Sequence, residues 1–377
     1  MATRIQLDHP STMMPRHIAV IGGGTGNKTA VAAFSQSPFN GEGVTAIAST
    51  FDDGGGTGAL REVYSALPAV GDMRQCFDAM SNLSPRALRA LASRFGAGEN
   101  VSDRLFLEGQ TLGNLIIAGV IQTEFANGGT FSSALKIVGE LLQAKGRVAP
   151  PSNDIRTLVY TLPGEDEPIF GEHQAEETKI PSFKGVEISF LEGSRDQCSD
   201  VRLAMKPAHI SQEADHAIRS ADVVILAPGD LYTSIAPNLA VEGMREALEA
   251  AKVVFMISNL MNRDRHTVGF TTYDYVREYE RIIGARVIDR VIYNNVRLDG
   301  LALKAQEAKG SHPVRPDAKG MKTSGYVVRG FDLLSHEKVV VDPNDSLGAT
   351  RSEIRHDPMK LATAVIEVYI NNGFSHK

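Results

Sequence analysis

Two glycine-rich segments of identical sequence are the residues of this chain best suited to bind a phosphate. The first is Gly22-Gly23-Gly24-Thr25-Gly26, and the second, Gly54-Gly55-Gly56-Thr57-Gly58, directly follows Asp52-Asp53. Glycines let an anion approach bare backbone N–H groups, and a helix that starts there favours negative charge. The two carboxylates can bind a hydrated divalent cation such as magnesium, or accept hydrogen bonds from a ribose or sugar. The pattern predicts a nucleotide or phosphate pocket.

Each glycine segment follows a short apolar run, at residues 18–21 and 44–48, that is typical of a buried strand. If these runs are neighbouring parallel strands, both segments leave the sheet at the same edge. The first segment departs from the dinucleotide fingerprint because Asn27 stands at the third glycine position, and it lacks a Walker ending. Taken alone, it fits a packing turn equally well. A turn in which Asp bonds its own backbone explains one acid of the second segment but not both, which favours binding.

Two further segments allow either a structural or a binding interpretation. Asp72 to Gln75 has the pattern of a helix capping box, but Arg74 in the same turn could face an anionic ligand. Gly113-Asn114 stands at the head of an apolar helix. Asn114 there either caps the helix, which is the simpler interpretation, or presents its amide to a ligand.

A fourth candidate is the segment Pro228-Gly229-Asp230-Leu231-Tyr232-Thr233-Ser234, which follows a β-type run and precedes a helix. Its Gly, Thr and Ser can donate N–H and hydroxyl groups to a phosphate. Asn259, after another strand, could bind hydroxyls or satisfy loop backbone. The sequence shows no nucleophilic triad and no His-Glu-x-x-His zinc motif, and His266 and His356 are expected to be ordinary surface or core histidines.

Composition indicates an ordinary globular protein. The chain has 377 residues, 42% hydrophobic and 22% charged, with a net charge of -6 that gives no reason to expect nucleic-acid binding. Its two cysteines, Cys76 and Cys198, exclude a disulfide framework or a Cys-rich zinc site. No run approaches the roughly 20 apolar residues of a membrane helix, and the polar residues 1–16 form a flexible tail rather than a signal peptide. We therefore expect a cytoplasmic protein without membrane insertion.

Strand-like and helix-like patterns alternate, which predicts βαβ units and a parallel sheet in an α/β fold. The middle of the chain, residues 146–214, is rich in Gly and Pro and is expected to be an inserted β-rich lobe between core segments 17–145 and 215–377. Residues 303–322 are expected to be a mobile surface loop, and Asp357-Pro358 to open the last helix. The other expected helices are 27–35, 59–64, 73–80, 112–125, 239–251 and 273–283, and the other expected strands are 157–161, 186–190, 222–227, 252–258 and 287–293.

As a set, these motifs resemble those of the CofD-like superfamily, and within it the YvcK-like or gluconeogenesis-factor branch. The resemblance covers roughly residues 17 to 370. Besides the segments above, it rests on Leu112-Gly113-Asn114-Leu115, Pro237-Asn238-Leu239, Ser258-Asn259-Leu260-Met261 and Arg355-His356-Asp357-Pro358. The forms Gly71-Asp72-Met73-Arg74 and Arg355-His356-Asp357-Pro358 place the chain nearer the YvcK-like branch than the transferase branch. It departs from that branch at Asn27-Lys28-Thr29 and at Gly56.

The resemblance implies a Rossmann-like three-layer fold whose ligands bind at the carboxyl ends of the strands. It also implies one of two functions. A YvcK-like protein is a regulator, linked to gluconeogenic growth and cell shape, that binds a nucleotide sugar of the UDP type; Arg355 and His356 would close its site. The alternative is a transferase related to 2-phospho-L-lactate transferase, acting on a nucleotide diphosphate-linked donor with magnesium. Whether this chain is an enzyme stays open, and a homodimer is expected only because dimers are common.

Overall fold

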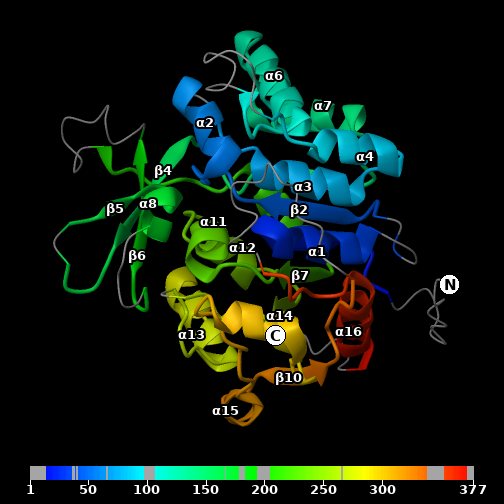
Figure 1. The fold of residues 1–377 in the computed structure, drawn as a ribbon, viewed down its shortest axis with the longest axis vertical. Coiled ribbons are helices and arrows are strands. Elements are labelled where there is room, and N and C mark those ends of the chain that lie inside the picture. Colours follow the sequence, from blue (N-terminus) through cyan, green and yellow to red (C-terminus); the bar gives the residue numbers. More distant parts are fainter. Residues whose placement is uncertain are drawn as a thin grey trace.

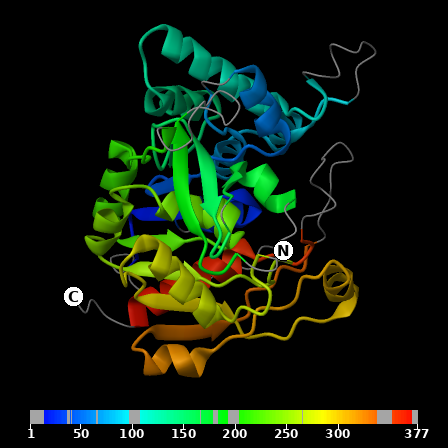
Figure 2. The same ribbon diagram turned by 90° about the vertical axis from the view of Figure 1, so that its left-hand side faces the viewer.

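The computed structural model describes residues 14–35, 39, 41–64, 67–96, 107–165, 167–177, 183–192, 204–264, 266–337 and 352–371. These residues form a seven-stranded parallel sheet with helices on both faces and a small three-stranded antiparallel sheet at one side (Figures 1 and 2). The predicted α/β fold with a parallel sheet is therefore confirmed. Residues 1–13 of the expected N-terminal tail, and Cys198, lie outside the described residues.

The order of the large sheet is β10-β9-β8-β7-β1-β2-β3, with every pair of neighbours parallel. The chain runs outward from β1 to β2 and β3, then returns to β7 on the other side of β1. Such a reversal of strand order opens a crevice at the carboxyl ends of the two central strands, where ligands of open α/β sheets bind. The seven strands are β1 (Ile18–Gly22), β2 (Val44–Ala48), β3 (Arg147–Ala149), β7 (Val223–Leu226), β8 (Val254–Ile257), β9 (Arg290–Asn294) and β10 (Val327–Phe331).

The central strands are apolar on both faces because helices cover both. All five residues of β1 are buried: Ile18 and Val20 face one core, and Ala19 and Ile21 face the other. The first core is covered by α1 (Gly24–Ser35), α3 (Gly71–Met80), α6 (Leu112–Ala126), α7 (Phe131–Leu141) and α16 (Pro358–Asn371). The second is covered by α10 (Gln212–Ser220), α11 (Ala236–Leu239), α12 (Met244–Glu249) and α13 (Thr272–Ile283).

The small sheet has the order β5-β4-β6 and lies beside α11 and α13 (Figure 1). Its strands are β4 (Arg156–Thr161), β5 (Ile169–Phe170) and β6 (Glu187–Glu192). The short helix α8 (Gly171–Glu177) lies between β5 and β6 in the chain. All three strands fall inside the expected lobe at 146–214, whereas β3, at the start of that range, pairs with β2 in the large sheet. Tyr160 and Phe183 of the lobe are buried in the same core as β7.

Two expectations about helices and loops are wrong. Residues 303–322 are not a loop but contribute to α14 (Gly300–Glu307) and α15 (Ala318–Thr323), and β10 follows them. Residues 239–251 are not one helix, because Gly243 has a φ of +92° and separates α11 from α12. The helices α2 (Gly55–Val63) and α4 (Pro85–Ala92) complete the fold. Among the described helices, none combines the length and the apolar character needed to cross a bilayer.

Gly26 provides a test of how closely the loops pack. A Cβ atom there would lie 1.9 Å from the carbonyl oxygen of Pro228. We expect Gly26→Ala to lower the free energy of unfolding by at least about 2 kcal/mol, because the two loops must separate. Gly119 is the matched control, since it is exposed within α6 and has open space around it. Gly119→Ala should stabilise by about 0.5–1 kcal/mol. Equal effects in urea unfolding would contradict this account.

Candidate functional site

A cavity of about 320 Å³ lies at the carboxyl ends of the strands, above the reversal of strand order between β1 and β7. The β1–α1 loop contributes Gly23, Gly24, Thr25 and Gly26 to its lining. The loops after β2, β7 and β8 contribute the predicted residues Asp52, Gly54, Gly229, Ser234 and Asn259. The sequence expectation that both glycine segments leave the same edge of the sheet is confirmed, because β1 and β2 are parallel neighbours.

The first glycine segment is shaped by close contact with two other loops. Gly24 has a φ of +63° and begins α1, whose first N–H groups have no partner within the helix. A Cβ atom at Gly23 would lie 2.6 Å from Oδ2 of Asp72 and 2.9 Å from the carbonyl oxygen of Ser234. The glycines are thus required for packing, and the same packing leaves the α1 N-terminus facing the cavity. Gly22 does not line the cavity and packs against Asn27 and Ala227.

Asp52 and Asp72 form the acidic part of the cavity. Burial, and then the charge of Asp72, raise the pKa of Asp52 to about 7, although Oδ1 of Asp52 accepts a 2.7 Å hydrogen bond from the Gly54 N–H. Asp53 lies elsewhere: a Cβ atom at Gly171, in the lobe, would stand 1.8 Å from its Oδ2, and Asp53 does not line the cavity. The carboxylates that could hold a magnesium ion in the cavity are therefore Asp52 and Asp72. Two carboxylates with ligand phosphates suit that ion.

The capping box expected at Asp72 is wrong. The residue at the N-cap of α3 is Val70, and no side chain caps this helix end. The side chain of Asp72 instead lines the cavity next to Gly23.

Arg74 enters the cavity from α3 and is held by α6. Its Nε donates a 3.0 Å hydrogen bond to Oδ1 of Asn114, and its guanidinium pairs with Asp78. The cap of α6 is Thr111, whose hydroxyl accepts from the Asn114 N–H, so the expectation that Asn114 itself caps the helix is wrong. Gly113 makes room for the arginine, since a Cβ atom there would lie 2.6 Å from Cδ of Arg74. Asn114 lines the cavity and Gly113 does not.

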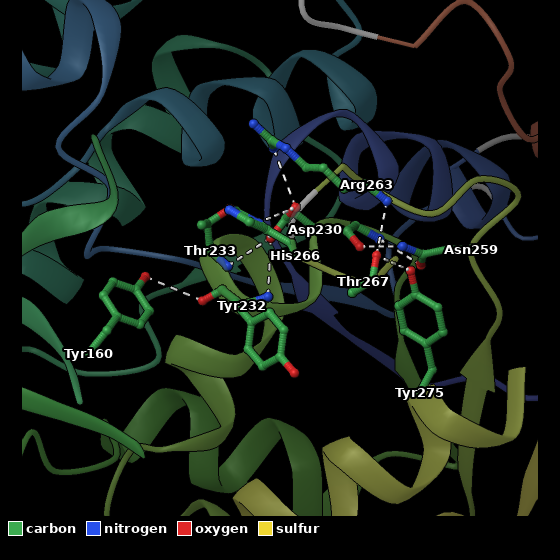
Figure 3. A network of polar contacts seen from close by, with 10 residues as sticks. Tyr160, Asp230, Tyr232, Thr233, Asn259, Arg263, His266, Thr267 and Tyr275 are labelled. Atoms are coloured by element: carbon green, nitrogen blue, oxygen red, sulfur yellow. Dashed lines mark hydrogen bonds and ion pairs between the residues drawn. The ribbon is translucent and has the colours of Figure 1, made fainter. Parts of the chain in front are cut away.

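The loop after β7 is organised by Asp230, which sequence reasoning did not select. Its carboxylate accepts hydrogen bonds from the N–H groups of Tyr232 and Thr233, at 3.1 and 3.0 Å, and so caps the π-helical turn η3 (Leu231–Ile235) (Figure 3). Nδ1 of His266 lies 3.0 Å from Oδ2 of Asp230, and Nη1 of Arg263 lies 3.4 Å from it. Burial would raise the pKa of Asp230, but His266, Arg263 and the hydrogen bonds hold it well below its usual range. These neighbours thus balance the negative charge of Asp230 at the cavity wall.

The remaining residues of this loop divide between two environments. Ser234 and Gly229 line the cavity, and Asn259 fixes Gly229 through hydrogen bonds to its N–H at 3.3 Å and its carbonyl at 2.6 Å. Tyr232 and Thr233 are buried behind the loop, where the Tyr232 hydroxyl donates a 2.9 Å hydrogen bond to Glu278. Asn259 therefore both satisfies loop backbone and lines the cavity.

A second cavity of about 150 Å³ adjoins the first and shares Thr25, Gly26, Gly229 and Asn259 with it. It contains Arg355 and His356 from the segment before α16, as well as Pro228. Its apolar lining comes from Leu260, Met261 and Ile354. Burial lowers the pKa of His356 to about 4, and its Nε2 lies 3.1 Å from the carbonyl oxygen of Ser258, so His356 is neutral at pH 7 and donates there.

Several cavity residues carried no recognisable sequence signal. Gln306 and Ser311 come from the region expected to be a loop, and Arg263 lies in none of the sequence motifs. Arg94, Glu172 and Ser352 also line it without a sequence signal, whereas the lining residues Thr57, Gln75, Met261 and Asn262 lie in or beside the motifs.

A parallel sheet of this strand order, with a glycine-rich loop between its first strand and first helix, defines a Rossmann-like α/β protein. The chain belongs to the CofD family, described as 2-phospho-L-lactate transferase CofD, whose pattern matches residues 18–334.

Several relatives match along nearly their whole length. A Thermotoga maritima protein, provisionally named a gluconeogenesis factor, is 32% identical over 351 residues, which cover 92% of this chain and 98% of the relative. The gluconeogenesis factor of Bacillus subtilis is 29% identical over 354 residues, covering 93% and 97%. A crystal structure of a UPF0052 family protein from Bacillus halodurans has a TM-score of 0.76 at 25% identity, covering 93% of this chain and 99% of that one.

The acidic pair predicts a pH-dependent stability. The pKa of Asp52 is about 7 in the folded protein, against 3.8 for an ordinary Asp, so the folded state holds its proton more tightly. The free energy of unfolding therefore falls as the pH rises from about 4 to 7. Asp52→Asn should remove this loss of stability. The loss is about 2 kcal/mol, less than the full pKa shift implies, because Asp52 is only half-buried. Urea unfolding at pH 5 and pH 8, with a chelator present, measures it.

The control for this prediction is Asp299→Asn, which makes the same charge change at an exposed position. Its unfolding should keep the pH dependence of the wild type. An Asp52→Asn protein that still loses the same stability between pH 5 and pH 8 would show that the pair does not interact as described.

Proposed function

We propose that this protein is a regulator that binds a nucleotide diphosphate-linked ligand of the UDP-sugar type. The observation that carries the proposal is the position of the α1 N-terminus, where Thr25 and Gly26 line both cavities. Backbone N–H groups at a helix N-terminus are a ready site for a diphosphate. A ligand centred there can extend a different group into each cavity.

The two cavities differ in chemistry, which suggests an orientation. The larger one offers Asp52, Asp72, Asn114 and Asp230, which suit the hydroxyl groups of a sugar. The smaller one offers apolar contact from Leu260 and Ile354 beside Arg355. Such a surface suits a base or ribose, with the guanidinium near the phosphates. The diphosphate would then lie over residues 24–26.

A regulatory role fits the name of a relative. The Bacillus subtilis relative is named gluconeogenesis factor, which names a physiological effect rather than a reaction. We therefore propose that ligand occupancy, in the cytoplasm, is the signal.

The alternative is a transferase of the 2-phospho-L-lactate type, which the family match favours. In that case Asp52 and Asp72, together with ligand phosphates, would hold magnesium, which neutralises phosphate charge as the bond to the leaving group breaks. Arg74 would add a fixed positive charge on the same side of the cavity.

Thermal-shift measurements with nucleotides and nucleotide sugars, with magnesium or with a chelator, separate the two functions. For a regulator we expect a UDP-sugar to raise the melting temperature in both conditions, with the ligand recovered unchanged after long incubation. Turnover, or stabilisation by GDP-linked ligands only when magnesium is present, would establish the transferase instead. If no nucleotide shifts the melting temperature, both proposals fail.

Arg355 supplies a second test of the site. We expect Arg355→Gln to weaken binding of a UDP-sugar about tenfold or more, because a cation near a diphosphate contributes on the order of 1.5–3 kcal/mol. Titration calorimetry measures the affinity. The matched control is Arg329→Gln, an equal change of charge at an exposed position of β10. If both variants bind alike, Arg355 does not contact the ligand.

A further inference from the structure

Helix α14 (Gly300–Glu307) buries a polar side chain where a surface helix normally buries apolar ones. Gln306 is its only buried residue, with 2% of its surface exposed. Leu301 of the same helix is 84% exposed. An amphipathic helix is ordinarily held by an apolar stripe. Packing of apolar surface therefore does not explain why a glutamine occupies this position.

Gln306 lines the larger cavity, and its side-chain amide is buried and incompletely bonded. Its Nε2 has no hydrogen-bond partner among the residues that the structure describes. An unsatisfied buried amide costs on the order of 1–3 kcal/mol. Such a cost at a cavity wall is expected when a ligand supplies the missing acceptor.

The backbone around Gln306 is well anchored, which gives the amide a defined position. The Gln306 carbonyl accepts from the N–H groups of Lys309 and Ser311, at 3.0 and 3.1 Å. The next residues are tied to the loop after β8, through Asn262 N–H to the His312 carbonyl at 2.7 Å and Val314 N–H to the Leu260 carbonyl at 3.0 Å. Gln306 therefore lies on the β8 side of the cavity, where Asn262 and Arg263 also lie.

We propose that Gln306 is a ligand-contact residue whose Nε2 donates a hydrogen bond to an uncharged oxygen of the ligand, outside its diphosphate. This inference rests on the proposed binding of a nucleotide diphosphate-linked ligand. The α1 N-terminus, Arg74 and Arg355 already provide donors and charge for phosphates, whereas an amide suits a neutral acceptor. That acceptor is a base carbonyl or an oxygen of the sugar and its substituents.

Gln306→Met tests the proposal, because methionine is of similar length and lacks the donor. We expect affinity for UDP-N-acetylglucosamine, measured by calorimetry, to fall about tenfold. We also expect the ligand-free protein to melt at the same or a higher temperature, because an unsatisfied buried donor is removed. A glutamine with a purely structural role would give the opposite result, a lower melting temperature and an unchanged affinity. Ala305→Met, at an exposed position of the same helix, is the control.

Comparison of UDP, UDP-glucose and UDP-N-acetylglucosamine locates the acceptor. A loss confined to the sugar-bearing ligands places it on the sugar and supports the proposal. An equal loss for all three supports the proposal if uridine, which has no diphosphate, shows the same loss; an unchanged affinity for uridine would place the acceptor on the diphosphate and overturn it. If the wild type binds and Gln306→Met binds all three equally well, this inference alone is overturned. If the wild type binds no nucleotide, the proposed function fails and this inference fails with it.

Discussion

The contact between the β1–α1 loop and the loop after β7 is the constraint on which the site depends. Their strands are neighbours, paired in register from Ile18 and Val223 to Ile21 and Leu226, so both loops leave the sheet at the same edge. They meet so closely that the carbonyl oxygen of Pro228 occupies the space of any side chain at Gly26. The two loops therefore touch through their backbones at Gly26, with no side chain between them. The α1 N-terminus faces both cavities. The structural and the phosphate-binding interpretations of the glycines are compatible, because one packing arrangement produces both.

Charge is distributed unevenly around the larger cavity. Four carboxylates line it, those of Asp52, Asp72, Glu172 and Asp230, and the first two interact unfavourably. Asp230 is offset by His266, Arg263 and two backbone N–H groups, so it acts as a fixed part of its loop. The charge of Asp72 raises the cost of ionising Asp52. A cation or a set of hydroxyl groups placed between them relieves that cost, which makes this end of the cavity the part most responsive to a ligand.

Much of the fold could be predicted from the sequence, because apolar runs such as residues 18–21 and 44–48 indicate buried strands. The position of each site residue could not. Whether Asp72 caps α3 or faces the cavity depends on the orientation of that helix, which packing against α1 and α6 decides. The neighbours Asp52 and Asp53 look equivalent in sequence, yet only Asp52 lines the cavity, while Asp53 lies against Gly171 of the lobe. Helix α14 escaped prediction because it has no apolar period: its single buried residue, Gln306, is polar.

The loop after β7 lies between the cavity and the lobe, and this position matters for whether ligand binding can be a signal. Phe183 of the lobe packs against both Tyr232 and His266, with ring centroids 5.5 and 4.5 Å apart. Oε1 of Glu278 accepts from the Tyr232 hydroxyl and from the Gly185 N–H, at 2.9 and 3.1 Å, which ties the lobe to the same loop. The backbone of that loop therefore contacts the cavity on one side, at Gly229 and Ser234, and the lobe on the other. A transferase needs only the cavity side, whereas a regulator needs a surface that changes with occupancy. The loop after β7 is a physical connection between the cavity and the lobe, of the kind that a regulator requires.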